Sequence, residues 1–292
     1  MLDELAAIGP YFAVSAHPPA AAPAAPWRPA GELAGPSEAL RDRVAAVRAA
    51  LAARGGRAVG EIEPRVAAST VHLGLAARLV SPALGAAVLG GRLDLRPGGL
   101  WWQDAVGGPA PLSVPAPARG APPVRGRRGP DQGAARGASP GDGGDGGDAG
   151  DPGQAGEWSR LLMDELVAPV TAAIARLVPV SGRVLWGNVA SAVNAAAAQV
   201  ARQRPDLAER AWQAAGQLFG SRPLHAERHP PGPAFRRSSC CLFYRLALSY
   251  QQAPADQQAP GHQQAPGYQQ APVRPRAQVN PSAVCGDCVL AR

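Results

Sequence analysis

A proline-containing repeat most limits what the C-terminal part of this chain can fold into. The unit Gln-Gln-Ala-Pro starts at residues 251, 257, 263 and 269, so a proline recurs every six residues. Each proline removes a backbone donor and fixes φ, which excludes a continuous helix or a central strand. Aliphatic side chains that could build a core are almost absent from the tract. We therefore predict a disordered loop at about residues 249–280.

A second low-complexity tract occupies residues 104–156. It has no hydrophobic period, and five arginines precede a run in which Asp recurs every third residue among glycines. A calcium-binding repeat would also need a regular apolar position, which is missing here. We predict a disordered insertion. The chain contains 35 Gly and 32 Pro, and because the excess gathers in these two tracts, the rest of the sequence should be ordered.

Residues 1–103 have the pattern of a mainly helical segment. Ser37 is a candidate N-cap, the pair Gly55-Gly56 ends the same helix, and between them four apolar residues follow at helical spacing: Leu40, Val44, Val47 and Leu51. A second helix is predicted from Arg65 to about Leu79, with Pro64 in its first turn.

We expect Pro82 to interrupt this helical pattern and to open another short helix, which ends at Gly90-Gly91. Two short apolar runs at residues 93–95 and 100–102 flank Pro97-Gly98-Gly99. This arrangement predicts a small β-hairpin.

Helical periodicity resumes in residues 157–234, with a kink expected at Pro169. Four apolar residues share one helical face there: Leu162, Leu166, Val170 and Ile174. A further helix over 184–202 is long and uncharged, but its alanines and polar residues favour a buried helix of a soluble protein over a membrane span. Pro205 starts one more helix, which ends near Gly220. The sequence thus predicts an α+β fold that is predominantly α-helical, followed by a short C-terminal lobe at residues 235–292.

The formal net charge of +7 raises the question of nucleic-acid binding. The arginines are scattered, and their densest group lies in the Gly/Pro-rich insertion without aromatic residues for stacking, so we expect no nucleic-acid partner. The N-terminus is acidic and lacks the basic region of a signal peptide. We therefore expect a cytoplasmic protein, whose thiols stay reduced.

All four cysteines lie in the last part of the chain, as Cys240-Cys241 and as Cys285-Gly-Asp-Cys288. Four thiolates are the ligand set of a 2Fe–2S cluster. The Cys-x-x-Cys pair also suits zinc, although adjacent cysteines usually diverge, which disfavours tetrahedral chelation of one ion. A thioredoxin-like motif would open a helix after a strand, yet few residues follow Cys288. Spacing alone leaves these three chemistries open.

The residues around the cysteines resemble the C-terminal cluster domain of FhuF-like ferric-siderophore reductases. The resemblance is carried by Arg-Arg-Ser-Ser-Cys240-Cys241-Leu-Phe-Tyr-Arg and by Cys285-Gly-Asp-Cys288-Val-Leu. Members of that family also share segments like residues 66–82 and 185–192 of this chain. The resemblance implies that the four cysteines bind a 2Fe–2S cluster, which passes one electron to siderophore-bound Fe(III) and releases Fe(II) in the cytoplasm.

The resemblance also suggests partners and further site residues. The substrate would be a ferric siderophore, of hydroxamate type for example, and peripheral contact with the membrane is compatible with this interpretation. No nicotinamide or flavin fingerprint is visible, so the electron donor would be another protein such as a ferredoxin or flavin reductase. Three arginines flank the ligands and could offset an anionic cluster, and three residues of the 185–192 segment could line a siderophore pocket: Arg236, Arg237 and Arg245; Trp186, Asn188 and Ser191.

The spacing between the cysteine pairs departs from the family pattern. The family has ten residues between its pairs, whereas 43 residues separate Cys241 from Cys285 here. Closing the longer loop costs only about 1.3 kcal/mol more, far less than four metal–thiolate bonds contribute. We expect the site to survive the insertion. Two alternatives stay open: a non-catalytic 2Fe–2S electron carrier or sensor, and a structural zinc protein with four cysteine ligands.

Overall fold

The computed structural model describes residues 1–19, 21–35, 37–116, 152–222, 224, 229–243 and 245–246. Most of the predicted 104–156 insertion lies outside these residues. So do the predicted repeat loop at 249–280 and the second cysteine pair, Cys285 and Cys288.

Helices dominate the described chain, and one small sheet accompanies them, so the predicted α+β, mostly helical fold is confirmed. The α-helices are α1 (Leu2–Ile8), α2 (Glu38–Arg54), α3 (Pro64–Val88), α4 (Pro152–Leu161), α5 (Ala168–Leu177), α6 (Gly182–Gln203) and α7 (Ala208–Phe219). A π-helical turn, Leu162–Val167, joins α4 to α5. Short 3₁₀ helices occupy Ala30–Ala34, Val59–Glu61 and Pro205–Leu207. The strands are β1 (Ser15–His17), β2 (Arg28–Pro29), β3 (Trp101–Trp102) and β4 (Leu112–Pro115).

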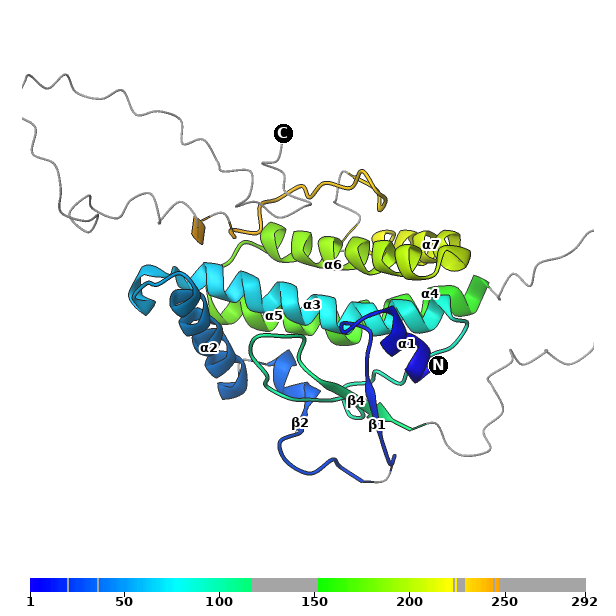
Figure 1. Cartoon of the computed structure of the whole chain (residues 1–292), viewed down its shortest axis with the longest axis horizontal. Coiled ribbons are helices and arrows are strands. Elements are labelled where there is room, and N and C mark those ends of the chain that lie inside the picture. Colours follow the sequence, from blue (N-terminus) through cyan, green and yellow to red (C-terminus); the bar gives the residue numbers. More distant parts are fainter. Residues whose placement is uncertain are drawn as a thin grey trace, which may run out of the picture.

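The elements lie in layers (Figure 1). Helices α6 and α7 form one layer, α3 lies beneath them together with α4 and α5, and the sheet covers the far side of α3. The strand order is β1-β4-β3-β2, with β1 parallel to β4 and the other pairs antiparallel. Helix α3 is therefore central. The core packs against it, and it also contacts the segment that carries Cys240 and Cys241.

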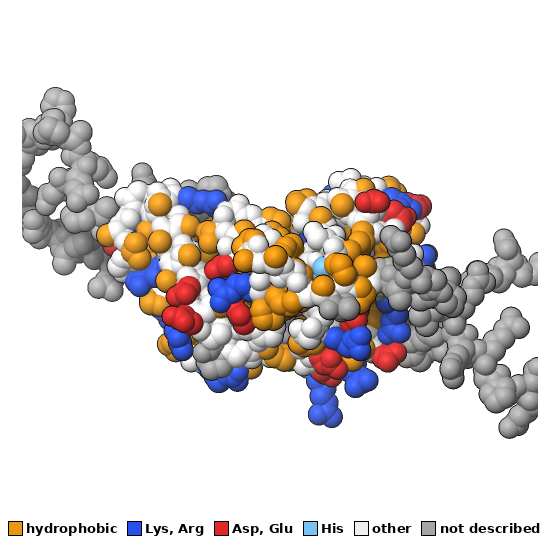
Figure 2. Space-filling model, turned by 90° about the horizontal axis from the view of Figure 1, so that it is seen from below, with side chains coloured by type: hydrophobic (Ala, Val, Ile, Leu, Met, Phe, Trp, Pro, Cys, Tyr) orange, Lys and Arg blue, Asp and Glu red, His pale blue; other side chains and the backbone are white. Residues whose placement is uncertain are grey.

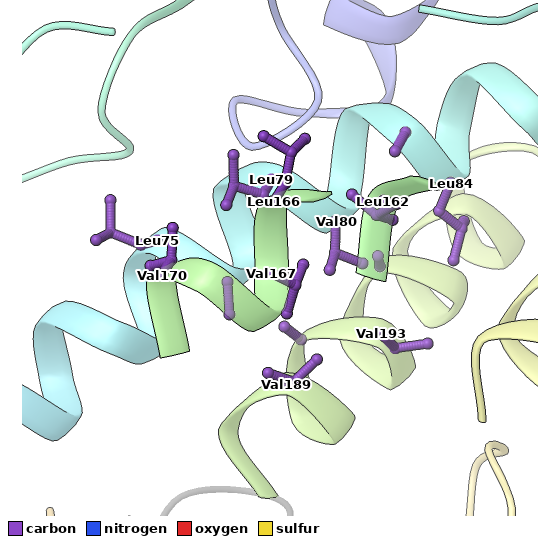
Figure 3. Packing of buried hydrophobic residues seen from close by; sticks show 14 of the residues in the cluster. Leu75, Leu79, Val80, Leu84, Leu162, Leu166, Val167, Val170, Val189 and Val193 are labelled. Atoms are coloured by element: carbon purple, nitrogen blue, oxygen red, sulfur yellow. The ribbon is translucent and has the colours of Figure 1, made fainter. Parts of the chain in front are cut away.

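The core forms where α3 meets the π turn, α5 and α6. Side chains from these elements point toward one another in Figure 3, among them Leu75, Leu79, Val80 and Leu84; Leu162, Leu166, Val167 and Val170; and Val189 and Val193. The predicted apolar face from Leu162 to Ile174 is thus confirmed as buried. Helix α3 is long and apolar enough to cross a membrane by length and composition, but 78% of its apolar 18-residue stretch is buried inside the protein, as in a core helix.

The buried Arg78 ties α3 to the layer of the sheet. Its guanidinium donates to the carbonyl oxygens of Ala110 and Tyr11, each at 2.6 Å, and also to that of Ala13. Burial lowers the pKa of Arg78 to about 10. Because the carbonyls take up its donors, the charged side chain is tolerated inside the protein and holds the loops before β1 and β4 against α3.

Several predicted boundaries agree with the structure. Ser37 caps α2 by accepting a hydrogen bond from the backbone N–H of Leu40 at 3.2 Å, and that helix ends at Arg54, before the glycine pair. Helix α6 covers the segment expected over 184–202. Near Pro169, where a kink is expected, the chain forms a π-helical turn that ends at Val167, which fits a residue that cannot donate to the preceding helical turn.

The predicted break at Pro82 is wrong. Helix α3 continues through it from Pro64 to Val88, with Pro82 itself buried. A proline inside a helix costs roughly 3 kcal/mol. The residues on both sides, Leu79, Val80 and Leu84, are buried in the core, so their packing offsets that cost.

The predicted hairpin and the start of the predicted insertion also need correction. Residues 93–95 form no strand; β3, within the predicted 100–102 run, pairs instead with β2 and β4. Strand β4 lies inside the tract expected to be disordered from residue 104, and Leu112 and Val114 are buried. Its few apolar residues lie between prolines, so the alternation of apolar and polar residues is too short to predict a strand. Helix α4 likewise begins at Pro152, earlier than the expected residue 157.

Candidate functional site

The first cysteine pair lies in a segment without regular helices or strands, residues 229–243, which runs across α6 on the side away from α5 (Figure 1). Cys240 is half-buried and Cys241 is buried. The segment follows the last helix of the described chain, so its position depends on side-chain contacts with the helices below it.

A backbone N–H points at the Cys240 sulfur. The N–H of Leu242 donates to Cys240 Sγ, with 3.3 Å between nitrogen and sulfur. Leu242 has a φ of 69°, in the left-handed region that non-glycine residues rarely adopt. This turn brings the N–H back over the cysteine two residues earlier. Such a donor stabilises a thiolate more than a thiol, and N–H groups directed at cysteine sulfurs tune metal–thiolate centres.

Cys241 is held through its carbonyl oxygen by α3. Ser69 Oγ donates to this oxygen at 2.9 Å. Asn188 of α6 donates from Nδ2 to the backbone oxygen of Ser69 at 3.0 Å and to its Oγ at 3.1 Å. The three residues form a buried hydrogen-bonded chain in which α3 and α6 together fix the backbone of the cysteine pair.

Arg237 extends this chain. Its Nη2 donates to Asn188 Oδ1 at 2.6 Å and, more weakly, to the backbone oxygen of Val184 at 3.3 Å. The side chain is only 1% exposed, yet no described carboxylate lies within ion-pair distance of it. Its Nε has no hydrogen-bond partner among the described residues. A buried cation without a counter-charge is costly, so the site favours a nearby anion.

His72 completes the buried network. Its Nε2 lies 2.9 Å from Thr171 Oγ1, and its Nδ1 lies 3.5 Å from Asn188 Nδ2. Burial lowers the pKa of His72 to about 3, and the positive charge of Arg237 acts in the same direction. The imidazole is therefore neutral at physiological pH, and it packs inside the protein with a polar group near each ring nitrogen.

Two contacts in the middle of the segment seat it closely on α6. Ser239 Oγ donates to the backbone oxygen of Arg183 at 2.7 Å, and the N–H of Gly232 donates to Asn194 Oδ1 at 2.8 Å. Gly187 allows the close approach: a Cβ there would stand 2.3 Å from Ser239 Oγ and 3.2 Å from Arg237 Nη2.

The end of the segment is tied to the loop before α3. Arg245 Nη1 bonds Glu63 Oε1 at 2.7 Å, and Arg57 donates to the carbonyl oxygen of Leu246. The hydrogen bond from Arg245, with a second from Arg65, lowers the pKa of Glu63. These exposed or half-exposed contacts add modest stability, but they fix where the chain leaves the cysteine pair.

The other predicted site residues occupy different environments. Arg236 is exposed, and Trp186 is half-buried and packs against the core. Asn188 is fully buried in the network described above, whereas Ser191 is buried and borders a groove between α3 and α6. Because Cys285 and Cys288 lie outside the described residues, the structure brings together only the first cysteine pair with its flanking arginines.

A complete metal site is not visible in the described part of the chain. No three His, Cys, Asp or Glu side chains gather there in a way that could hold an ion. The donor set that is present nonetheless fits an anionic metal–thiolate centre, since a half-buried sulfur receives an N–H and a buried cation stands three residues before it.

Sequence reasoning missed Ser69 and Gly187 as residues that position the site. Both lie within the segments 66–82 and 185–192, which carry part of the family resemblance. That resemblance was the one indication in the sequence that these residues matter. The hydrogen bond from Ser69 to Cys241 joins residues 172 positions apart and leaves no local pattern.

Comparisons with protein-family models, with curated proteins and with solved structures find no match to this chain.

Proposed function

We propose that Cys240, Cys241, Cys285 and Cys288 hold a 2Fe–2S cluster and that the protein is a cytoplasmic ferric-siderophore reductase similar to the FhuF-like family. The observation that carries the proposal is the environment of Cys240. Its sulfur accepts the Leu242 N–H at 3.3 Å, in a segment that a buried network fixes to α3 and α6. A cysteine sulfur that is held in place with a donor aimed at it is suited to metal ligation.

The charge around the pair supports the same assignment. When bound, a 2Fe–2S cluster takes up and gives back one electron at a time. Arg237 is buried without a carboxylate partner in the described chain, and Arg236 is exposed beside it. Positive charge at this position stabilises an anionic centre and raises its tendency to accept an electron. Arg236, on the surface, can attract an acidic donor protein such as a ferredoxin.

The proposed substrate chemistry needs only one electron. Siderophore oxygens of the hydroxamate type are hard donors that hold Fe(III) far better than Fe(II), so adding one electron to the ferric complex weakens it and frees the iron. The electron comes from a partner protein, which is oxidised by one electron in each turn. The protein's own part is to hold the donor centre near the surface, which the half-buried position of Cys240 allows.

Single-turnover oxidation tests the reductase. The protein is reduced with dithionite, freed of excess reductant and mixed with a ferric hydroxamate complex, and Fe(II) is trapped by a coloured chelator. We expect about one Fe(II) for each cluster, with faster transfer to hydroxamate complexes than to ferric citrate. Equal and slow transfer to all iron complexes would instead favour the electron carrier or sensor.

A structural zinc site is the second candidate, because Cys285-Gly-Asp-Cys288 has the spacing of a zinc knuckle. The visible spectrum of protein purified without oxygen separates the two, since zinc–thiolate centres are colourless and 2Fe–2S centres absorb in the visible. A colourless protein with one zinc per chain would replace the reductase with the structural role.

A further inference from the structure

A groove of about 490 Å³ lies between α3 and α6 and is bordered by the loop after α1, residues 9–12. Small and apolar side chains make most of its walls: Leu73, Ala77 and Ser81 from α3, and Ala192, Ala195 and Ala196 from α6. Its volume and apolar lining fall in the range of small-molecule sites. Neither cysteine of the first pair lines it, although Arg237 of the candidate site borders one end.

Two buried polar groups border this apolar groove and lack hydrogen-bond partners in the described chain. One is the hydroxyl of Ser191, whose residue is 7% exposed, and the other is Nε of the buried Arg237. Buried polar atoms are nearly always paired, so two orphans beside one cavity are unusual. They point to a partner group that enters the groove.

The charge at this end of the groove specifies what that partner is. Arg237 is a buried cation with no carboxylate within ion-pair distance among the described residues. Guanidinium groups bind carboxylates strongly, and a hydroxyl beside them adds a further donor. Both residues line the groove, and rotation about χ1 lets the Ser191 hydroxyl turn toward a ligand there.

The remainder of the groove is suited to a hydrocarbon chain. From Ser191 to Arg202, α6 advances roughly 16 Å along the groove at 1.5 Å per residue, and the wall between them is alanine. Arg202 and Gln199 stand at the far end, where Arg202 donates to Gln199 and Gln199 donates to the backbone oxygen of Ile8, the last residue of α1. An apolar tail would thus lie along the alanines, with its headgroup at Arg237.

We propose that this groove binds an amphipathic monocarboxylate of the medium-chain fatty-acid class, with its carboxylate on Arg237 and Ser191. The proposal does not rest on the reductase function, because neither the cysteines nor iron takes part in it.

The test is calorimetric titration of the purified full chain with decanoate and, as the neutral counterpart, methyl decanoate. Decanoate should bind roughly tenfold tighter or more, as expected for a charge-assisted hydrogen bond. Ala195→Trp fills the groove and should abolish binding of both compounds. Ala53→Trp, at an exposed alanine of α2, is the matched control and should bind decanoate like the unaltered protein.

Two substitutions at the proposed carboxylate site separate the contributions of Arg237 and Ser191. Arg237→Met should bind decanoate no better than the ester. That change also removes the donor to Asn188, so Ser191→Ala provides a second variant, which loses only a hydroxyl. It should weaken the binding of decanoate by about threefold to tenfold and leave the binding of the ester unchanged. Equal affinity of the acid and the ester for the unaltered protein would overturn the proposal, as would undiminished binding to Ala195→Trp.

Discussion

Arg237 donates a hydrogen bond to the side-chain oxygen of Asn188 across 2.6 Å, inside the protein. This contact joins the segment that carries the cysteine pair to α6, and Asn188 passes the connection on to Ser69 of α3. Because all three residues are buried or nearly so, the position of the cysteines depends on the same packing that holds the two central helices together.

Asn188→Ala should destabilise the protein markedly. It leaves the buried Arg237 guanidinium without its main acceptor and Ser69 without a donor, a loss of about 2–4 kcal/mol in the free energy of unfolding. Urea unfolding measures it. Gln213→Ala is the control, because that amide is exposed on α7 and bonds only Glu209 of the same helix. A change at Asn188 as small as that at Gln213 would contradict the account.

Two helical glycines should respond differently to replacement by alanine. At Gly216 of α7 no atom outside the local helix lies within 4 Å of an added Cβ, so Gly216→Ala should stabilise by about 0.5–1 kcal/mol. At Gly187 the added Cβ would stand 2.3 Å from Ser239 Oγ. In Gly187→Ala this overlap should cancel the gain in stability, and displacement of Ser239 should lower the content of the proposed cluster. Thermal unfolding and iron assays check this, and equal stabilisation at both glycines would show that the close approach is not needed.

Leu242 should prefer glycine to alanine. Its φ of 69° costs an L-residue about 1 kcal/mol or more. Leu242→Gly should therefore unfold at higher urea concentration than Leu242→Ala, both variants keeping the N–H that faces Cys240. The same pair of changes at the exposed Phe243, which lacks a positive φ, is the control, and there glycine should give no advantage. A preference for alanine at residue 242 would argue against the left-handed turn.

His72 should make stability depend on pH. Burial, with Arg237 nearby, lowers its pKa from 6.5 to about 3. As the pH falls below 6.5, the unfolded chain binds a proton there that the folded protein does not, so the free energy of unfolding decreases. Between pH 7 and pH 5 this contributes a loss of roughly 2 kcal/mol.

His72→Gln should remove this contribution, so the variant should lose less stability than the unaltered protein over the same pH range, measured by urea unfolding at each pH. Carboxylates such as Glu63 titrate in both proteins and cancel in the difference. Parallel pH profiles would mean that His72 takes up its proton in the folded state.

The helices of this fold were predictable because their signals are local. Ser37 caps a helix that ends at a glycine pair, and the four residues from Leu162 to Ile174 repeat along one face. The prediction at Pro82 was wrong because proline disfavours a helix interior locally, whereas the packing of the central helix α3 outweighs this preference. Strand β4 was missed because its pairing with β1 bridges residues about a hundred positions apart, which no short window reveals.

Only the residue types of the candidate site were recognisable from the sequence. The cysteines and flanking arginines stand out in the sequence, but nothing there distinguishes Arg237 from Arg236. The structure buries the first and exposes the second, because only Arg237 reaches Asn188 and the oxygen of Val184. The link from Ser69 to Cys241 depends equally on how α3 and α6 pack.

The central claim is that both cysteine pairs, separated by a long spacer, bind one 2Fe–2S cluster. Iron and acid-labile sulfide should be measured in protein purified without oxygen, for the unaltered chain and for serine variants of Cys240, Cys241, Cys285 and Cys288. We predict about two iron atoms and two sulfides per chain, and a loss of both in every variant. Protein without sulfide, or variants of the second pair that keep a full complement of iron and sulfide, would contradict the account.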